Sequence, residues 1–364
     1  MYLTVEDVGD IARGTAFLGA GGGGDPYYAH LLVKQALQEG CQIELLDPDD
    51  LADDALVIPS AMMGAPTVLL EKLPGGDEIL LSVRRLEDHL GQTAVATMPI
   101  ECGGINGLVP LVVGAHLGLP VVDADGMGRA FPELQMETFH VHGVSGTPMV
   151  LTNEYGDSVL ITTHNNEMME WLARGITIRM GGVAYIAEYP MDGATVKRTA
   201  VPRTLSLSLT IGRCLRMALD QAIDPFTALS QHLKTTPYHF SHVIFEGKVI
   251  DVLRQTTTGF AKGKAFIEAA TDSRRHLEVV FQNEYLLARE KDRVRAMVPD
   301  LICVLDSRTA QPIATETIRY GQQVKVMAVS APEMLRTSEA LAVFGPQVFG
   351  FKQTFCPVEQ LCQE

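Results

Sequence analysis

The sequence predicts an α/β fold: a three-layer domain with a mainly parallel sheet, followed by a β-rich, barrel-like second domain. Over residues 41–130, short apolar runs alternate with segments of helical spacing, as in strands that helices connect within a parallel sheet. Beyond Tyr238, nearly all segments are short, have strand character and end in glycine turns. We therefore expect domains at residues 1–236 and 237–364, with a C-terminal segment that can pack back on the rest.

Composition and charge exclude several classes of protein. The 364 residues are 46% hydrophobic and 20% charged, and the formal net charge of −15 argues against nucleic acid or an anionic membrane as the main partner. None of the six cysteines forms a Cys-x-x-Cys pair, which suggests reduced thiols in the cytosol. Pro110, Gly114 and Pro120 break the longest apolar run, and no signal peptide is recognisable. We expect a cytoplasmic homo-oligomer that acts on a small molecule.

A predicted helix over residues 4–18 leads into a glycine-rich loop. Residues 19–26 read Gly-Ala-Gly-Gly-Gly-Gly-Asp-Pro, and such a bare backbone can turn its N–H groups toward an anion or polar ligand. Asp25 and Pro26 start the next helix, which Gly40 ends. A tight turn would also explain glycines, but four in a row lose more backbone entropy than a turn requires. The substrate-binding candidates here are Gly21, Gly22, Gly23, Gly24 and Asp25.

Two familiar nucleotide-binding motifs do not fit this loop. No Gly-Lys-Ser/Thr follows the glycines, so the loop is not a Walker A motif. A dinucleotide fingerprint needs a preceding strand, whereas residues 4–18 have helical spacing. The loop therefore joins two helices.

The rest of the first domain alternates between strands and helices. Strands are predicted over residues 41–46, 55–58, 94–98 and 120–122, and helices over 79–89, 108–117 and from near Ala130. Loops 60–66, 101–107 and 123–129 each follow a strand. Because ligands bind at the carboxyl ends of parallel strands, we expect these loops to meet at one sheet edge.

Further along, helices and strands are mixed before the second domain begins. Strands are predicted at 140–142 and 176–187, a hairpin at 149–153 and 158–163, and helices at 166–174, 204–219 and 224–233. In the second domain, strands are predicted at 241–245, 248–254, 264–270, 276–281, 286–289, 301–305 and 323–329.

An acidic cluster follows the fourth strand. Asp123 and Asp125 could act as a general base or ligate a divalent metal, and Arg129 could hold a substrate carboxylate. Alternatively, Asp125 caps a turn and Arg129 pairs with Glu133. All of these residues follow a strand end, where a ligand is expected.

The loop after the third strand carries two more candidates. Glu101 is a candidate catalytic acid or base, and Asn106 either orients a ligand or caps the following helix. Cys102 would need a nearby base or helix N-terminus to act as a nucleophile, so a packed thiol fits it better.

Two histidines alternate on the strand predicted at 140–142. Together with Asp123, His140 and His142 would make a zinc site, although alternating histidines also suit a solvated strand face. A divalent metal such as zinc is therefore a candidate cofactor.

Four motifs resemble the S-methyl thiohydantoin desulfurase family, which is distantly related to hydantoinase and oxoprolinase proteins. They are FLGAGGGGDP at 17–26, DADGMGRAFPE at 123–133, QNEY at 282–285 and VPDLI at 298–302. The resemblance covers nearly the whole chain. The resemblance implies a three-layer α/β domain followed by a β-barrel-type domain. It also implies a hydrolytic desulfurisation, but membership of a fold or family does not determine the substrate.

We predict a hydrolase of a small five-membered cyclic amide or thioamide, such as a hydantoin-like ring. Water would attack the ring carbon between the nitrogens, glycine-loop donors would stabilise the developing charge, and Asp123 or Asp125 would take the proton. Arg129 would anchor a carboxylate side arm. Two alternatives remain: an ATP-using amidohydrolase or carboxylase subunit, and a non-enzymatic metabolite-binding subunit of a complex.

Overall fold

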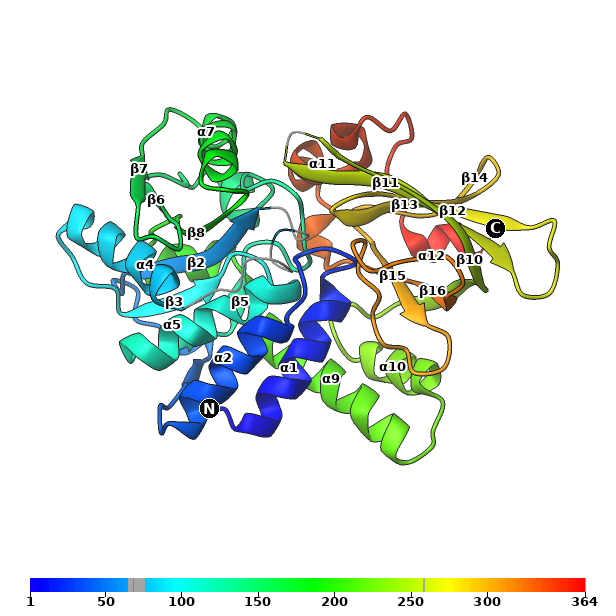
Figure 1. Ribbon diagram of the computed structural model, residues 1–364, viewed down its shortest axis with the longest axis horizontal. Coiled ribbons are helices and arrows are strands. Elements are labelled where there is room, and N and C mark those ends of the chain that lie inside the picture. The colour runs from blue at the N-terminus through cyan, green and yellow to red at the C-terminus, as the bar shows by residue number, and fades with distance from the viewer. Residues whose placement is uncertain (65–67, 69–75, 258, 364) are drawn as a thin grey trace.

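The computed structural model describes residues 1–64, 68, 76–257 and 259–363. Figure 1 shows two parts side by side: helices around a twisted sheet, and a long curved sheet that carries most of the later strands. The C-terminal end of helix α1 (Val5–Leu18) lies where the two parts meet, and helix α2 (Tyr27–Gln38) runs from there along the first part. Within the described residues, no helix is both long and apolar enough to cross a membrane.

Among the described residues, the first sheet has seven strands in the order β1-β4-β3-β2-β8-β6-β7. They are β1 (Leu45–Leu46), β4 (Val121–Val122), β3 (Ala96–Pro99), β2 (Val57–Gly64), β8 (Val183–Ala187), β6 (Met149–Thr152) and β7 (Ser158–Ile161). The first four pair in parallel, whereas the β2–β8, β8–β6 and β6–β7 pairs are antiparallel. Only β8 and β7 therefore run against the rest, which confirms the mainly parallel sheet.

Helices cover both faces of this sheet, as the three-layer prediction requires. On β2, Ile58 and Met62 pack with α1, α2, α4 (Asp77–Leu90) and α5 (Val109–Leu117). The alternate residues Val57, Ala61 and Met63 pack with α7 (Asn166–Arg179) and α8 (Gly193–Thr199). Successive side chains of a strand point to opposite faces, so one apolar run supplies both cores.

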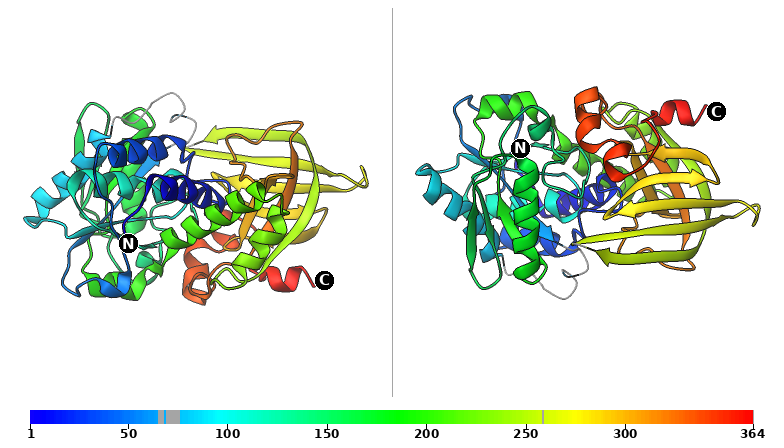
Figure 2. Two further views of the ribbon diagram at one scale, coloured as in Figure 1. Left: turned by 90° about the horizontal axis from the view of Figure 1, so that it is seen from below. Right: turned by 90° about the horizontal axis from the view of Figure 1, so that it is seen from above.

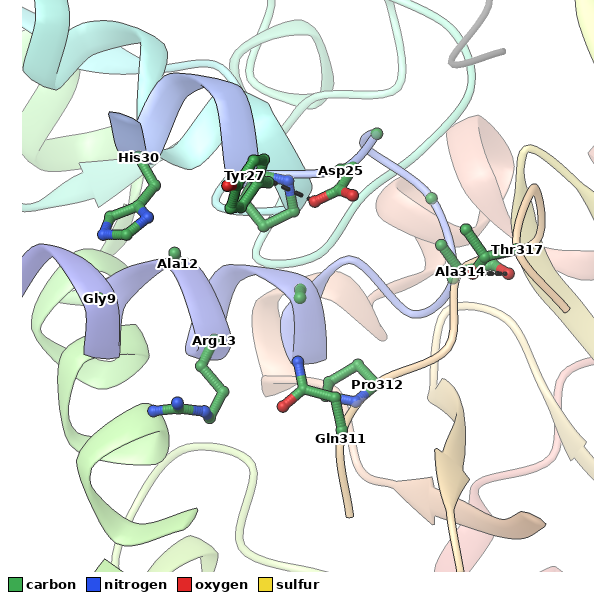
Figure 3. Close-up of a pocket in the computed structure, with 15 residues that line it drawn as sticks. Gly9, Ala12, Arg13, Asp25, Tyr27, His30, Gln311, Pro312, Ala314 and Thr317 are labelled. Carbon is green, nitrogen blue, oxygen red and sulfur yellow. Dashed lines mark hydrogen bonds between the residues drawn. The ribbon is translucent and has the colours of Figure 1, made fainter. Parts of the chain in front are cut away.

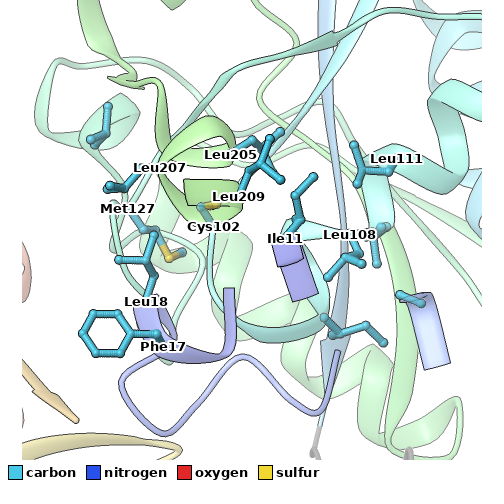
Figure 4. Close-up of a cluster of buried hydrophobic side chains, with 14 of the residues drawn as sticks. Ile11, Phe17, Leu18, Cys102, Leu108, Leu111, Met127, Leu205, Leu207 and Leu209 are labelled. Atoms are coloured by element: carbon cyan, nitrogen blue, oxygen red, sulfur yellow. The ribbon is translucent and has the colours of Figure 1, made fainter. Parts of the chain in front are cut away.

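Helices α9 (Thr204–Asp220) and α10 (Pro225–Leu233) extend the helical layer that contains α1 toward the second sheet. Helix α9 crosses α1 closely: a Cβ at Gly14 would lie 1.9 Å from the Ser208 carbonyl oxygen. Arg216 donates to both carboxylate oxygens of Asp10 at 2.9 and 2.8 Å. Helix α10 follows, and Figure 4 shows the apolar cluster in which α1, α9 and the loop after β3 meet.

The second sheet is antiparallel and has the order β14-β13-β12-β11-β10-β16-β15. Its strands are β10 (Ser241–Thr257), β11 (Phe260–Ala269), β12 (His276–Gln282), β13 (Glu284–Glu290), β14 (Arg293–Met297), β15 (Leu301–Asp306) and β16 (Gln323–Val329). Irregularities in the pairing of β10 curl the sheet into the half-barrel seen in Figure 2. This confirms the predicted barrel-like second domain.

Short elements complete the chain. They are α6 (Thr138–Val141), the β5 (Ala124–Asp125) and β9 (Val201–Pro202) pair, α11 (Ser338–Phe344), α12 (Val358–Leu361), and 3-10 turns at 48–50, 104–107, 333–335 and 346–349. In the C-terminal segment, Phe344 of α11 stacks on Phe131 with ring centroids 4.7 Å apart.

Several local predictions were wrong. The strand expected at 140–142 is helix α6, because Phe139 is pulled into the core beneath α7. No helix begins near Ala130, since residues 126–137 form irregular turns around the buried Arg129. Helix α7 continues to Arg179, into the predicted strand 176–187. Residues 60–64, expected in a loop, extend β2, and the loop residues 65 and 66 lie outside the described residues.

Candidate active site

The glycine loop, residues 19–25, joins the two sheets. The Gly23 carbonyl accepts a hydrogen bond from the Ile105 N–H (2.9 Å), on the loop after β3. The Ala20 carbonyl accepts one from the Tyr285 N–H (2.9 Å), in β13 of the second sheet. The chain therefore crosses here between a loop of the first domain and a strand of the second.

Close approach of other groups explains why these positions lack side chains. A Cβ at Gly22 would lie 2.1 Å from Glu284 Oε1, and one at Gly23 would lie 2.4 Å from the Gly103 carbonyl oxygen. Gly21 and Gly23 also have φ angles of +91° and +75°, which L-residues rarely adopt. The loop is therefore packed tightly against the Glu284 carboxyl group and the Gly103 carbonyl group.

A small cavity of about 50 Å³ opens beside Gly23. At about 10–15 Å³ for each water molecule, it has room for a few waters or one small planar group. The cavity lies where the sequence predicts a site, at the carboxyl ends of β2 and β3. Its lining includes Gly23, Met62, Met63, Gly64, Glu101, Asn106, Met127, Phe131, Pro132, Glu133, Arg174, Asn283 and Glu284.

Asn106 fixes Glu101 in this cavity. The Asn106 side chain accepts from the Met62 N–H (2.8 Å) and donates to the Met62 carbonyl (3.0 Å) and to Glu101 Oε1 (2.6 Å). Burial raises the pKa of Glu101 to about 8, although the Asn106 amide opposes that rise. Its other oxygen, Oε2, makes no hydrogen bond to the described residues. The Phe131 backbone N–H also opposes the rise in pKa, but burial prevails, and Glu101 is mainly in its neutral form at pH 7.

Glu284, at the start of β13, is a second buried acid on the same cavity. Burial, followed by the charge of Glu101, raises its pKa, while the Arg129 guanidinium and the Gly23 backbone N–H act in the opposite direction. Its Oε2 also has no hydrogen-bond partner in the described part of the chain. Sequence reasoning did not select Glu284 as a site residue, although it lies in the QNEY motif of the resemblance.

Arg129 is fully buried and ties the two domains together. Its guanidinium donates to the carbonyls of Pro299 (3.2 Å), Asp300 (2.9 Å) and Tyr285 (3.2 Å). It does not line the cavity, but its charge acts on Glu284. The geometry gives Arg129 the role of a counter-charge and interdomain clamp, without the exposed fork that a substrate carboxylate would need.

Asp123 and Asp125 accept hydrogen bonds from backbone N–H groups and do not line the cavity. Asp125 Oδ2 accepts from the N–H groups of Cys102 (2.7 Å) and Gly128 (2.8 Å), and burial raises the pKa of Asp125 to about 7. Asp123 Oδ1 accepts from the Ser206 N–H (2.9 Å) in the first turn of α9. Neither aspartate borders the cavity.

Asp25 faces a different cavity, of about 380 Å³, that also borders Gly21, Gly22 and Gly24 (Figure 3). Its carboxylate accepts from the N–H of Tyr27 (2.9 Å), the first residue of α2, although the N-cap is Pro26 and not Asp25 as predicted. The residues proposed as one substrate-binding loop therefore divide between two cavities, with Gly23 alone lining the one that holds Glu101.

The structure does not assemble the predicted zinc site. His140 lies in α6, where its Nδ1 is 3.0 Å from the Asn166 amide, and His142 follows the helix. No group of three or more His, Cys, Asp or Glu among the described residues is arranged to hold a metal ion. The proposal of Asp123, His140 and His142 as joint ligands is therefore not supported by the geometry. Cys102 is a buried thiol, 3.2 Å from Ser208 Oγ.

Two further buried glutamates lie outside the lining of this cavity. Glu137 and Glu188 are fully buried, and none of their four carboxylate oxygens hydrogen-bonds to the described residues. Burial and their mutual repulsion raise the pKa of Glu137, and the charges of Asp125 and Glu101 add to this. The first domain therefore carries several acids that fold in their neutral form.

These acids predict that stability falls as the pH rises from about 5 to about 8. The unfolded carboxyls release their protons near pH 4, whereas folded Asp125 and Glu101 hold theirs to about 7 and about 8. In between, each such group lowers the free energy of unfolding by about 1.4 kcal/mol per pH unit. We expect calorimetry to give the highest Tm near pH 5.

Other titrating groups do not reverse this trend. Carboxyls with a lowered pKa, such as Glu278, contribute their full stabilisation above the unfolded pKa, so they add nothing further above pH 5. The lowered pKa values of His30 and His232 act the other way, but both side chains are only partly buried. A Tm that climbs between pH 5 and pH 8 would contradict the raised carboxyl pKa values.

Two family models together match nearly the whole chain. The S-Me-THD-like N-terminal domain matches residues 6–163, and the S-Me-THD-like C-terminal domain matches residues 164–358. The fold is similar to the crystal structure of a protein from Chromobacterium violaceum, with a TM-score of 0.83 and 25% sequence identity over 98% of this chain and 100% of that one. No curated protein matches the sequence.

Proposed function

The chain belongs to the S-Me-THD-like family, and we propose that it hydrolyses a small five-membered cyclic amide or thioamide, such as a hydantoin or thiohydantoin ring. One observation supports this most directly: two buried carboxyls, Glu101 and Glu284, border one small cavity and each has an oxygen free for a ligand. A pair of carboxyls with raised pKa values can divide acid and base roles between them.

We assign the base role to Glu284 and the acid role to Glu101. Burial raises the pKa of Glu284 well above its usual range, and the Arg129 guanidinium opposes this rise; in the proposal, Glu284 accepts a proton from the attacking water when it is ionised beside this counter-charge. Glu101, with a pKa of about 8, keeps its proton at neutral pH and donates it to the departing nitrogen or sulfur. The bond from the ring carbon to that atom breaks as the water oxygen bonds to the same carbon.

The remaining residues position this pair. Asn106 holds Glu101 Oε1, and the Gly23 N–H holds Glu284, so both carboxyls are fixed before a substrate enters. In this proposal the glycine loop acts through Glu284, and Asp125 orders the loop that carries Glu101 by accepting from the Cys102 N–H.

A substrate panel tests the proposal. The purified chain is incubated with hydantoin, 2-thiohydantoin and S-methyl-2-thiohydantoin, with linear amides as controls, and products and released sulfur are measured by mass spectrometry. We expect turnover of at least one ring substrate and of no linear amide. No turnover of any ring, together with thermal stabilisation by ATP and magnesium, would favour the ATP-using alternative.

A further inference from the structure

A surface groove of about 710 Å³ adjoins the active-site cavity. It runs along α7, and Phe260 of β11 forms its opposite wall. We call it the α7 groove. Glu133 and Arg174 line both the α7 groove and the cavity that holds Glu101 and Glu284, so the two spaces share one wall.

The shared wall is rigid. Arg174 Nε donates to Glu170 Oε1 at 2.7 Å, and Nη2 donates to the Pro132 carbonyl at 2.9 Å. The guanidinium carbon also lies 4.5 Å from the centre of the Phe260 ring. Because these contacts fix Arg174 between a helix of the first domain and a strand of the second, the groove has a defined shape next to the cavity.

The floor of the groove is apolar and exposed. Trp171 is 70% exposed and Ile178 is 51% exposed, and they lie on one face of α7 at positions i and i+7. Between them, a Cβ at Gly175 would meet nothing within 4 Å, which leaves open space beside the indole. Large apolar side chains exposed together commonly mark a binding site.

The charges around the groove balance. Glu170 pairs with Arg174, and Glu167 lies 3.6 Å from His140 Nε2. Arg179 also lines the groove, and Lys262 Nζ lies 6.0 Å from the centre of the Phe260 ring, so the three carboxylates, Glu133 included, are matched by three cations. A neutral aromatic or aliphatic group can cover Trp171 and Phe260 without disturbing this balance.

We propose that the α7 groove binds a neutral aromatic or branched aliphatic substituent of the ring substrate, whose ring lies in the cavity between Glu101 and Glu284. This inference rests on the proposed function for the identity of the ring. It assigns the selectivity to Trp171 and Phe260, which contact the substituent and take no part in proton transfer.

Trp171 is the only tryptophan of the chain, so its fluorescence reports binding at the groove alone. We would titrate the protein with 5-benzylhydantoin and with unsubstituted hydantoin. We expect 5-benzylhydantoin to shift the Trp171 emission to shorter wavelength, and to bind at least tenfold more tightly by calorimetry than hydantoin does. Phe260→Ala and Ile178→Ser should each weaken 5-benzylhydantoin binding severalfold, and Tyr155→Ala, at an exposed residue outside the groove, should not.

Three outcomes would overturn the inference: an unchanged emission spectrum at saturation, equal affinities for the two rings, or a spectrum that depends on protein concentration instead of ligand, which would make the groove an interface between copies. The titration needs no turnover. If 5-benzylhydantoin binds at Trp171 and is not hydrolysed, the groove assignment stands and the proposed hydrolase activity fails.

Discussion

Glu101→Gln is expected to lower kcat for a ring substrate by about 10²- to 10⁴-fold, the usual contribution of a general acid or base. Glutamine has nearly the same shape and can keep the contact with Asn106 after an amide flip, but it has no proton to donate to the leaving group. The loss should therefore appear in kcat more than in KM. Steady-state kinetics on the best substrate of the panel would measure it.

The pH profile distinguishes a catalytic role from a structural one. In the native protein, activity should decline above about pH 8, as Glu101 loses the proton that burial holds on it. The residual activity of Glu101→Gln should lack this alkaline limb. If the variant folds normally and turns over at more than a tenth of the native rate, Glu101 is not the acid.

Glu87→Gln is the matched control. Glu87 is also a buried glutamate, and its carboxylate accepts from the Ala94 N–H at 2.8 Å, outside the cavity. We expect this variant to keep the native kcat and pH profile, even where its Tm is lower. Equal losses in the two variants would point to a general effect of replacing a buried carboxyl group.

The strand-end rule predicted the position of the loop that carries Glu101 because the rule depends only on chain order. Parallel strands end at one edge, so the loop with Glu101 and Asn106 had to lie near the end of β2, and it does. The same rule could not separate Glu101 from Asp123 and Asp125, since all three follow strand ends. What separates them is which backbone N–H groups each carboxylate meets, and this depends on where α9 and the loop after β3 lie.

Glu284 shows a different limit. It reaches the cavity from a strand more than 150 positions beyond Arg129, through a turn in which Asn283 has a φ of +57°. Local pattern identifies QNEY as a turn, and only the docking of two sheets makes it part of a site. The zinc site predicted at His140 and His142 is wrong for the opposite reason. The alternation at 140–142 indicated a strand, but with Phe139 in the core these residues lie in and just after a helical turn.

Gly21→Ala is expected to destabilise the protein strongly. A Cβ at Gly21 would lie 2.3 Å from two carbons of the Tyr285 ring, and Tyr285 is fully buried with its hydroxyl donating to the Ile313 carbonyl. The ring has no room to retreat. Overpacking of this kind costs about 1–3 kcal/mol or more, in addition to about 1–2 kcal/mol for the positive φ.

Gly40→Ala separates these two effects. Gly40 has a φ of +98°, close to the +91° of Gly21, but a Cβ there would meet nothing within 4 Å. Gly40→Ala should therefore show the conformational penalty alone, whereas Gly21→Ala adds the clash, and urea denaturation would measure the difference. Gly21→Ala should also lose activity, because Tyr285 follows Glu284 directly and its N–H is bonded to the Ala20 carbonyl. Equal losses of stability in the two variants would mean that the loop yields to a side chain, and a loop that yields could not hold Glu284 in place for catalysis.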